Sequence, residues 1–175
     1  NGHNPGALLL SGEAGIGKSR LVYEFIQNVQ ATIRCRFFVC QTDEILRQSL
    51  NPFRYFLRDF FQQSAQQTVD ANRKTFDRIL HELTAATDAA ALKADLVRGR
   101  SFLAHLVDLH WENSLFAQLE PQLRFENTLY ALKTFFLAAS SQQPIILHVE
   151  DTHWLDEDSR QFLNILTHEI DAYPL

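Results

Sequence analysis

The chain has 175 residues, of which 46% are hydrophobic, and its formal net charge at pH 7 is −5. This length allows one domain with a proper core, and the acidic balance argues against a general nucleic-acid or membrane-surface binder. Because the sequence shows no signal peptide and no apolar run of about twenty residues, we expect a cytoplasmic protein. The chain begins with Asn1 and contains no methionine, so we also expect it to be a segment of a longer protein.

The most informative stretch runs from Ala7 to Ser19. The apolar run Ala7–Ser11 has the character of a buried strand, and it leads directly into Gly12–Ser19, which has the G-x-x-x-x-G-K-S pattern of a phosphate-binding P-loop. Glycine lets successive backbone N–H groups point at a triphosphate without a Cβ penalty. We expect Lys18 to reach the β- and γ-phosphates and Ser19 to place its hydroxyl on Mg²⁺.

A helix and a second strand are predicted next. Apolar residues at helical spacing follow the P-loop motif and predict a helix that fades near Gln30; they are Leu21, Val22, Phe25 and Ile26. Thr32–Cys40 is rich in β-branched and aromatic residues and predicts a strand. Its two cysteines, Cys35 and Cys40, point to opposite faces of such a strand, so they cannot pair with each other and are expected to be small buried residues.

The middle of the chain, residues 51–141, is predicted to be helical. Asn51 suits an N-cap with Pro52 at the first helical position. A stripe behind them has helical spacing and is expected to face the core: Phe53, Phe56, Leu57, Phe60 and Phe61. Further helices are predicted over Arg73–Ala86, over Ala89–Val97 with a possible cap at Asp88, over Phe102–Leu109 with a possible cap at Ser101, and over Arg124–Ser140 after a break at Glu120-Pro121.

A second group of chemically important residues follows this helical region. Ile145–Val149 reads as a buried strand, and it ends in Glu150-Asp151. Acids at the carboxyl end of such a strand lie where open α/β sheets bind ligands. This is the form of a Walker B element, in which one acid holds Mg²⁺ through its waters and the other orients the attacking water.

The residues after the acid pair are partly structural. Asp156 suits the N-cap of a helix, and the acids Glu157 and Asp158 suit its positive end. His153 is either a polar group close to the γ-phosphate or a structural histidine, and the sequence leaves both interpretations open.

Together, Ser11–Val22 and Ile146–Asp156 resemble the AAA-like ATPase domain of the STAND signal-transduction ATPases. The resemblance implies an α/β P-loop NTPase fold, a three-layer αβα arrangement with a parallel sheet and a large helical insertion between the second strand and the Walker B strand. It divides the chain into residues 1–50 (P-loop strand, helix and second strand), 51–141 (helical region) and 142–175 (Walker B strand and following helix). Relatives continue with another central strand and a helical lid. The strand would begin near Tyr173–Leu175 and lie between the P-loop and Walker B strands, so we expect an incomplete sheet.

The resemblance also implies a set of site residues. Glu150 stands at the Walker B position associated with Mg²⁺, which is usually an aspartate, and Asp151 stands at the acid that follows. Because glutamate replaces the usual aspartate, the sequence leaves open which of the two acids has which role. Catalysis is assigned to Asp151 and Glu150, and metal binding to Ser19, Glu150 and Asp151. His153, Trp154 and Asp156 match the signature that follows Walker B in the family. The residues implied in nucleotide binding are Gly12, Glu13, Ala14, Gly15, Ile16, Gly17, Lys18, Ser19 and Arg20.

The expected function is ATP binding with slow Mg²⁺-dependent hydrolysis, used as a nucleotide switch. The expected cofactors are ATP and Mg²⁺. The resemblance implies a homo-oligomer in the active state and kinase, cyclase, DNA-binding or helical-repeat domains in the same chain, with no membrane partner and no direct nucleic-acid binding. Two other functions stay open: a P-loop kinase acting on a small molecule, and a non-catalytic ATP-binding scaffold for partner docking.

Overall fold

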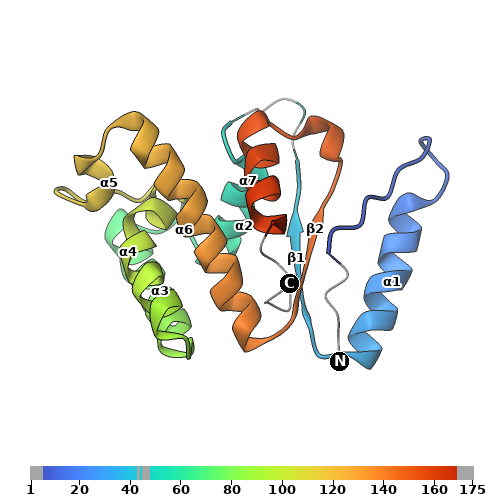
Figure 1. Ribbon diagram of the computed structural model, residues 1–175, viewed down its shortest axis with the longest axis horizontal. Helices are drawn as coiled ribbons and strands as arrows, with labels where there is room; N and C mark the ends of the chain where they lie inside the picture. Colours follow the sequence, from blue (N-terminus) through green and yellow to red (C-terminus); the bar gives the residue numbers. More distant parts are fainter. Residues whose placement is uncertain (1–5, 43, 45–47, 169–175) are drawn as a thin grey trace.

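The computed structural model describes residues 6–42, 44 and 48–168 of the chain. Within these residues the fold is mixed α/β, with a small parallel sheet and mostly helices (Figure 1). The elements are α1 (Lys18–Thr32), β1 (Arg36–Cys40), α2 (Asn51–Phe60), α3 (Val69–Ala85), α4 (Ala90–Leu106), α5 (Leu115–Gln118), α6 (Pro121–Gln142), β2 (Ile145–Val149), the 3₁₀ turn η1 (Thr152–Trp154) and α7 (Glu157–Thr167).

The two strands lie side by side although more than a hundred residues separate them in sequence. β1 and β2 pair in parallel, in a register that runs from Arg36 opposite Ile145 to Cys40 opposite Val149. A parallel pair needs a long crossover, and here the helices α2 to α6 supply it. The prediction of two strands joined by a large helical insertion is therefore confirmed.

An aromatic core joins the sheet to the helices. Phe136 of α6 lies 6.2 Å from Phe38 of β1, 5.7 Å from Phe56 of α2 and 5.9 Å from Phe162 of α7, measured between ring centroids. Seven phenylalanines are almost fully buried: Phe53, Phe61, Phe76, Phe102, Phe135, Phe136 and Phe162. The predicted apolar stripe of α2 faces this core, which explains the use of phenylalanine throughout the helical region.

One predicted pair of helices is a single helix. Ala89–Val97 and Phe102–Leu109 were expected to be separate, but α4 runs without a break from Ala90 to Leu106. Gly99 does not interrupt it, because α4 packs closely on α6 there: a Cβ on Gly99 would lie 3.0 Å from the Cβ of Ala131. The hydroxyl of Ser101 accepts a hydrogen bond from the backbone N–H of Phe116 (3.2 Å) and so helps to hold α5.

Two predicted caps are wrong, and one helix is longer than expected. The N-cap of α2 is Leu50, in the left-handed conformation (φ 58°), and Asn51 is already helical. The N-cap of α4 is Ala89 rather than Asp88, and it makes no side-chain capping bond. α3 begins at Val69, ahead of the predicted Arg73, because the Thr68 side chain accepts a hydrogen bond from the N–H of Ala71.

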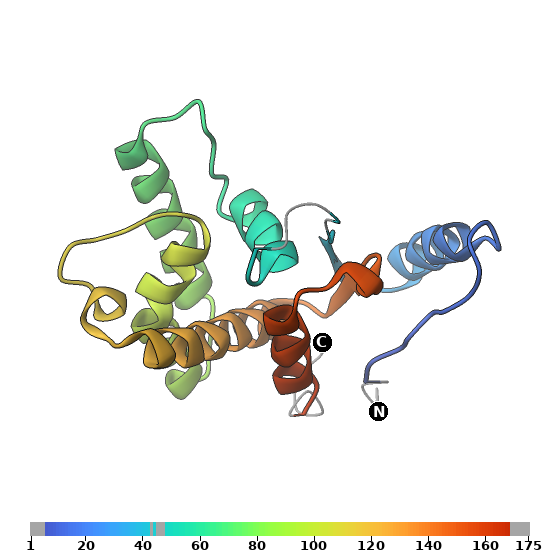
Figure 2. The same cartoon turned by 90° about the horizontal axis from the view of Figure 1, so that it is seen from above.

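The largest difference from prediction concerns the segment before the P-loop motif. Ala7–Ser11 forms no strand, and the described sheet has only β1 and β2, so the described residues do not confirm the predicted three-layer arrangement. Leu8 is 94% exposed, Leu9 is 75% exposed, and α1 buries none of its residues. Figures 1 and 2 show why: α1 and the P-loop motif lie at one end of the molecule, far from α3 to α5. Tyr173–Leu175, where a further strand was expected to begin, lies outside the described residues.

Both cysteines are free, as predicted. Cys40 is buried, and burial raises the pKa of its thiol to about 12, whereas Cys35 is only partly buried and precedes β1. Among the helices of the described residues, none combines the length and the apolar content that a membrane crossing requires.

Candidate nucleotide-binding site

The P-loop motif forms a glycine-dependent loop ahead of α1. Gly15 (φ 81°) and Gly17 (φ 96°) have left-handed backbone conformations, which glycine adopts at little cost. Gly17 is the N-cap of α1, and its carbonyl accepts a hydrogen bond from the N–H of Leu21 (3.0 Å). The first N–H groups of a 15-residue helix therefore face the loop, an arrangement that favours an anion.

Lys18 is the cation of this loop. Its Nζ donates hydrogen bonds to the carbonyls of Gly12 (2.8 Å) and Glu13 (2.9 Å), so the ammonium group lies across the loop rather than in open solvent. These two bonds explain how a loop without any buried side chain holds a defined shape. They also place a positive charge beside the N-terminus of α1, where the helix dipole already favours phosphate.

Ser19 and Arg20 occupy the first turn of α1, and both are exposed. The Ser19 hydroxyl is a hard oxygen ligand of the kind that Mg²⁺ prefers. Arg20 instead donates from Nε to Glu24 Oε1 (2.9 Å), an exposed pair one helical turn apart, so its charge is directed along α1 and away from the loop. The predicted role of Arg20 in nucleotide binding therefore has no geometric support in this loop.

Glu150 follows β2 directly and is held by β1. Its N–H donates to the carbonyl of Cys40 (3.1 Å), which continues the strand pairing by one residue. Its carboxylate accepts a long hydrogen bond from Gln41 Nε2 (3.5 Å) and lies 3.9 Å from Nδ1 of His148. Three neighbours on two strands therefore fix the position of this acid.

Asp151 begins a tight turn at the end of the same strand. It adopts a left-handed conformation (φ 48°), and its carbonyl accepts hydrogen bonds from the N–H of Trp154 (2.8 Å) and from the hydroxyl of Thr42 (2.9 Å). A left-handed non-glycine residue costs conformational energy and occurs often at functional sites. The side chain is exposed just beyond the carboxyl end of β2.

Asp156 is the structural acid of this segment, as predicted. Its carboxylate accepts hydrogen bonds from the N–H of Ser159 (2.9 Å) and from the Ser159 hydroxyl (2.6 Å), which caps α7. The same carboxylate also accepts the N–H of Leu50 (3.1 Å), which the sequence did not predict. The loop after the acid pair is therefore tied to the start of α2.

His153 and Trp154 form the short turn between the acid pair and α7. Their rings lie 4.8 Å apart between centroids, His153 is exposed and Trp154 is partly buried. The exposed imidazole is accessible from the same end of the sheet as Asp151. The structure thus leaves His153 free of a buried structural role.

The P-loop motif and the acid pair both lie on the upper side of the molecule in the view of Figure 1, without touching. The P-loop motif and the carboxyl ends of β1 and β2 point the same way in Figure 1. No hydrogen bond or ion pair of Gly12–Arg20 reaches Glu150 or Asp151 among the described residues. The described part of the chain also contains no cluster of three or more histidine, cysteine, aspartate or glutamate side chains placed to hold a metal. A Mg²⁺ ion at this site would need phosphate oxygens and water as further ligands, which is its usual behaviour.

Sequence reasoning missed three of the neighbours that position the acids. Gln41 and Thr42 follow β1, and His148 lies within β2 two residues before Glu150. Gln41 and Thr42 could have been found from the rule that polar side chains at the carboxyl ends of neighbouring parallel strands meet at one edge. His148 could have been found from the strand period, because residues two apart in a strand lie on the same face and His148 is two residues before Glu150.

In the described residues a glycine loop caps α1, a lysine side chain folds across that loop, and an acid pair follows a parallel strand. The sequence profile of the AAA ATPase domain matches residues 1–175, and the chain belongs to that family. Nucleotide binding and hydrolysis are the general activity of this family. No curated protein and no solved structure matches the chain.

Proposed function

We propose that this chain binds ATP with Mg²⁺ through the P-loop motif, hydrolyses it slowly, and serves as the nucleotide switch of a larger STAND-type signalling protein. The observation that carries the proposal is the loop geometry of Gly12–Ser19, with Lys18 Nζ held 2.8 Å from the carbonyl of Gly12. Family membership supports the nucleotide, and the acid pair after β2, on the same side of the molecule as the P-loop motif in Figure 1, supports hydrolysis.

Different residues of the proposed site are suited to bind the phosphates, the Mg²⁺ ion and the water. The backbone N–H groups of the loop and of the first turn of α1 bind phosphate, and Lys18 neutralises its charge. Bound Mg²⁺ supplies charge neutralisation at the phosphates, and the oxygens of Ser19 and Glu150 are the protein groups suited to hold it. Asp151 is exposed at the sheet edge and suits the task of orienting a water molecule.

The proposal requires the P-loop motif and the acid pair to meet over the same phosphates. α1 buries none of its residues, so no core contact opposes a movement of the motif toward β2. A nucleotide that binds both groups would favour the arrangement in which they are close, which is how a ligand shifts a conformational equilibrium. This is the physical basis of the proposed switch.

The decisive experiment measures Mg²⁺-ATP binding by calorimetry in the protein and in Lys18→Ala. The matched control is Lys74→Ala, which removes the same ammonium group from an exposed position on α3. We expect the Lys18 variant to bind at least about tenfold more weakly, because charged hydrogen bonds to phosphate are lost, and the control to bind normally. Equal binding by all three proteins, or no binding by any, contradicts the proposal.

A non-catalytic scaffold is the second candidate, and one observation favours it. The carboxylate of Glu150 is already engaged by Gln41 and His148, and the P-loop motif makes no described contact with either acid. Phosphate release by Asp151→Asn separates the two functions, with Glu157→Gln as the matched control in the following helix. If hydrolysis falls at least about a hundredfold only in Asp151→Asn, the chain is an ATPase. If ATP binds and no protein hydrolyses it, the scaffold is correct.

A further inference from the structure

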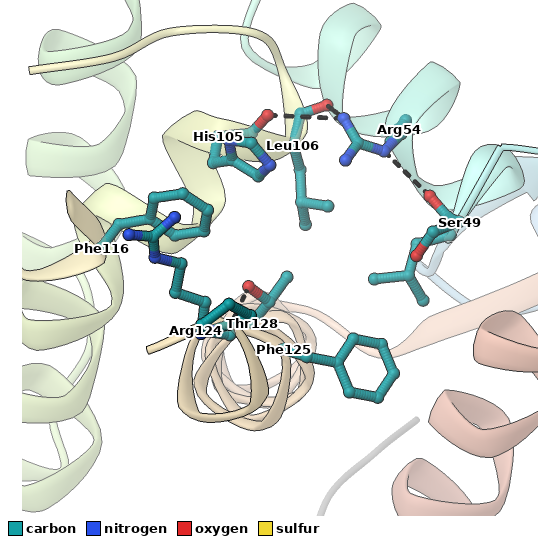
Figure 3. Close-up of a pocket in the computed structure, with 10 residues that line it drawn as sticks. Ser49, Arg54, His105, Leu106, Phe116, Arg124, Phe125 and Thr128 are labelled. Carbon is teal, nitrogen blue, oxygen red and sulfur yellow. Dashed lines mark hydrogen bonds between the residues drawn. The ribbon is translucent and has the colours of Figure 1, made fainter. Parts of the chain in front are cut away.

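A cavity lies in the helical region, away from the P-loop motif (Figure 3). It has a volume of about 230 Å³, and its walls come from the loop before α2, from α2, from the end of α4, from α5 and from α6. None of the ten described residues that line it is acidic, and two are arginines, Arg54 and Arg124. Its size is below the roughly 300–1,000 Å³ of typical drug-sized ligand pockets, so it suits a small molecule rather than a nucleotide.

Arg54 is a fixed cation at the rim of this cavity. Its side chain is only 11% exposed. Nε donates to the carbonyl of Ser49 (2.9 Å) and Nη1 to those of Leu106 (3.2 Å) and His105 (3.4 Å). Nη1 also lies 3.7 Å from the carboxylate of Asp108. Nη2 has no partner among the described residues, and Figure 3 shows it turned toward the cavity. Burial and the neighbouring Arg58 lower the pKa of Arg54, which marks a cation that would gain from an anionic partner.

Arg124 approaches from the opposite wall. Nε donates to the carbonyl of Leu119 (2.6 Å) and Nη2 to that of Ala117 (3.1 Å), and the guanidinium lies 5.3 Å from the ring centroid of Phe116. Nη1 is left without a partner among the described residues. Two guanidinium groups, each pre-oriented by backbone carbonyls and each with one nitrogen to spare, therefore face a single cavity.

His105 supplies the third polar group. Its ring stacks on Phe116 at 4.0 Å, and its Nδ1 is buried with no hydrogen-bond partner among the described residues. An unsatisfied buried polar atom costs free energy, and in a cavity wall it indicates a ligand or water contact. Burial first, and then the positive charges of Arg54, His110 and Arg124, lower the pKa of His105 to about 4, so the ring is neutral near pH 7. The remaining wall is largely apolar, with Leu50, Leu106 and Phe125.

We infer that this cavity is a binding site for a small organic carboxylate with an apolar body, held by Arg54, Arg124 and His105. A monocarboxylate matches two spare guanidinium nitrogens and a neutral imidazole, whereas a phosphate dianion calls for more donors than these. The apolar wall takes the body of the ligand. The site is separate from the nucleotide site, and its existence does not depend on the function proposed above.

The test uses sodium benzoate and sodium isovalerate as probes, with benzamide and isovaleramide as neutral molecules of the same shape. Binding is followed by the NMR shifts of the His105 ring in the ¹³C/¹⁵N-labelled protein. We expect saturable shifts with a carboxylate and at least about tenfold weaker binding of its amide, since the amide lacks the charge that the arginines recognise. Equal binding of acid and amide, or no saturable shift with either carboxylate, overturns the inference, as does tighter binding of inorganic phosphate.

Three variants locate the binding. Arg124→Gln removes one cation and should weaken benzoate binding about tenfold or more, whereas Arg98→Gln, an exposed arginine of α4 paired with Asp95, should leave it unchanged. Phe125→Trp enlarges a wall residue without altering charge and should also weaken binding by filling the cavity. If Arg124→Gln does not fold, the Trp variant decides. Normal benzoate binding by a folded Phe125→Trp places the ligand elsewhere and overturns the inference.

Discussion

The two ends of this molecule are stabilised in different ways. At one end, β1, β2 and the helices α2 to α7 bury a continuous aromatic core in which Phe53, Phe135 and Phe136 are fully enclosed. At the other end, the P-loop motif and α1 carry an apolar stripe that includes Leu21 and Phe25, yet α1 buries none of its residues. The first end gains its stability from packing, and the second holds its loop by local backbone geometry and the bonds of Lys18.

The difference shows that the loop of the P-loop motif and the hydrophobic core depend on different features of the sequence. The loop needs glycines at Gly15 and Gly17 and a lysine behind them, all within a few residues. The core needs side chains from distant segments, such as Phe38 and Phe136, to meet. We therefore expect substitutions in the two regions to have very different effects on stability.

The largest loss of stability is expected from Phe136→Ala. This ring is fully buried and lies within about 6 Å of five other phenylalanine rings, so its removal leaves a cavity in the middle of the core. We expect the free energy of unfolding to fall by about 3–5 kcal/mol, measured by urea denaturation followed by circular dichroism. A loss below about 1 kcal/mol would mean that the aromatic core does not hold this region together.

A smaller loss is expected from Asp156→Ala. The substitution removes the cap of α7 and the acceptor for the N–H of Leu50, which together should cost about 2 kcal/mol in the same measurement. Asp88→Ala is the matched control, because Asp88 precedes α4 without capping it and should change stability by less than about 0.5 kcal/mol. If both variants lose the same free energy, the capping argument is wrong.

These two aspartates also show how far the sequence predicts the structure. Both match the local signature of an N-cap, but only Asp156 makes the capping hydrogen bond. Helix α4 begins at Ala90, so its N-cap is Ala89 and not Asp88. Local rules did predict the strand at Ile145–Val149 and the P-loop motif, since both depend on contiguous residues. They predicted a break near Gly99, where close packing on Ala131 keeps α4 intact.

Tertiary partners account for the remaining errors. The run Leu8–Leu10 has the composition of a buried strand, but composition does not say which strand pairs with it, and here none of the described strands does. The cavity of the helical region could not be predicted from the sequence for a related reason. Arg54, His105 and Arg124 are each unremarkable in sequence, and only the packing of α2, α4 and α6 brings them together. The acid pair follows β2 as expected, whereas its contacts with Gln41 and Thr42 depend on the pairing of β1 with β2.

The stability of the packed region should depend on pH through His105. Its pKa is about 4 in the folded protein and near 6.5 when exposed, so protonation favours the unfolded chain. The stabilisation is therefore complete above about pH 6.5 and is lost as the pH falls toward 4. Allowing for solvent screening of this half-buried group, we expect about 1–2 kcal/mol less stability over that range.

The measurement for His105 is the urea midpoint between pH 7 and pH 4, compared with His105→Gln. Glutamine stays neutral, so the difference between the two proteins removes the contribution of the carboxylates, which titrate in the same range. We expect the free energies of unfolding of the two proteins to diverge by about 1–2 kcal/mol as the pH falls toward 4. Parallel curves would show that His105 is already solvated in the folded state.

The smallest effect is expected from Phe25→Ser on α1. Phe25 is 50% exposed and belongs to a helix that buries nothing, so its loss should change the free energy of unfolding by less than about 0.5 kcal/mol, against several for Phe136→Ala. Urea denaturation without nucleotide measures this directly. A loss above about 1.5 kcal/mol would mean that α1 packs against the rest of the molecule and that the two ends share one core. A negligible loss, together with ATP binding that depends on Lys18, would mean that nucleotide recognition depends on the loop and the first turn of α1 and does not need packing of α1 against the rest of the molecule.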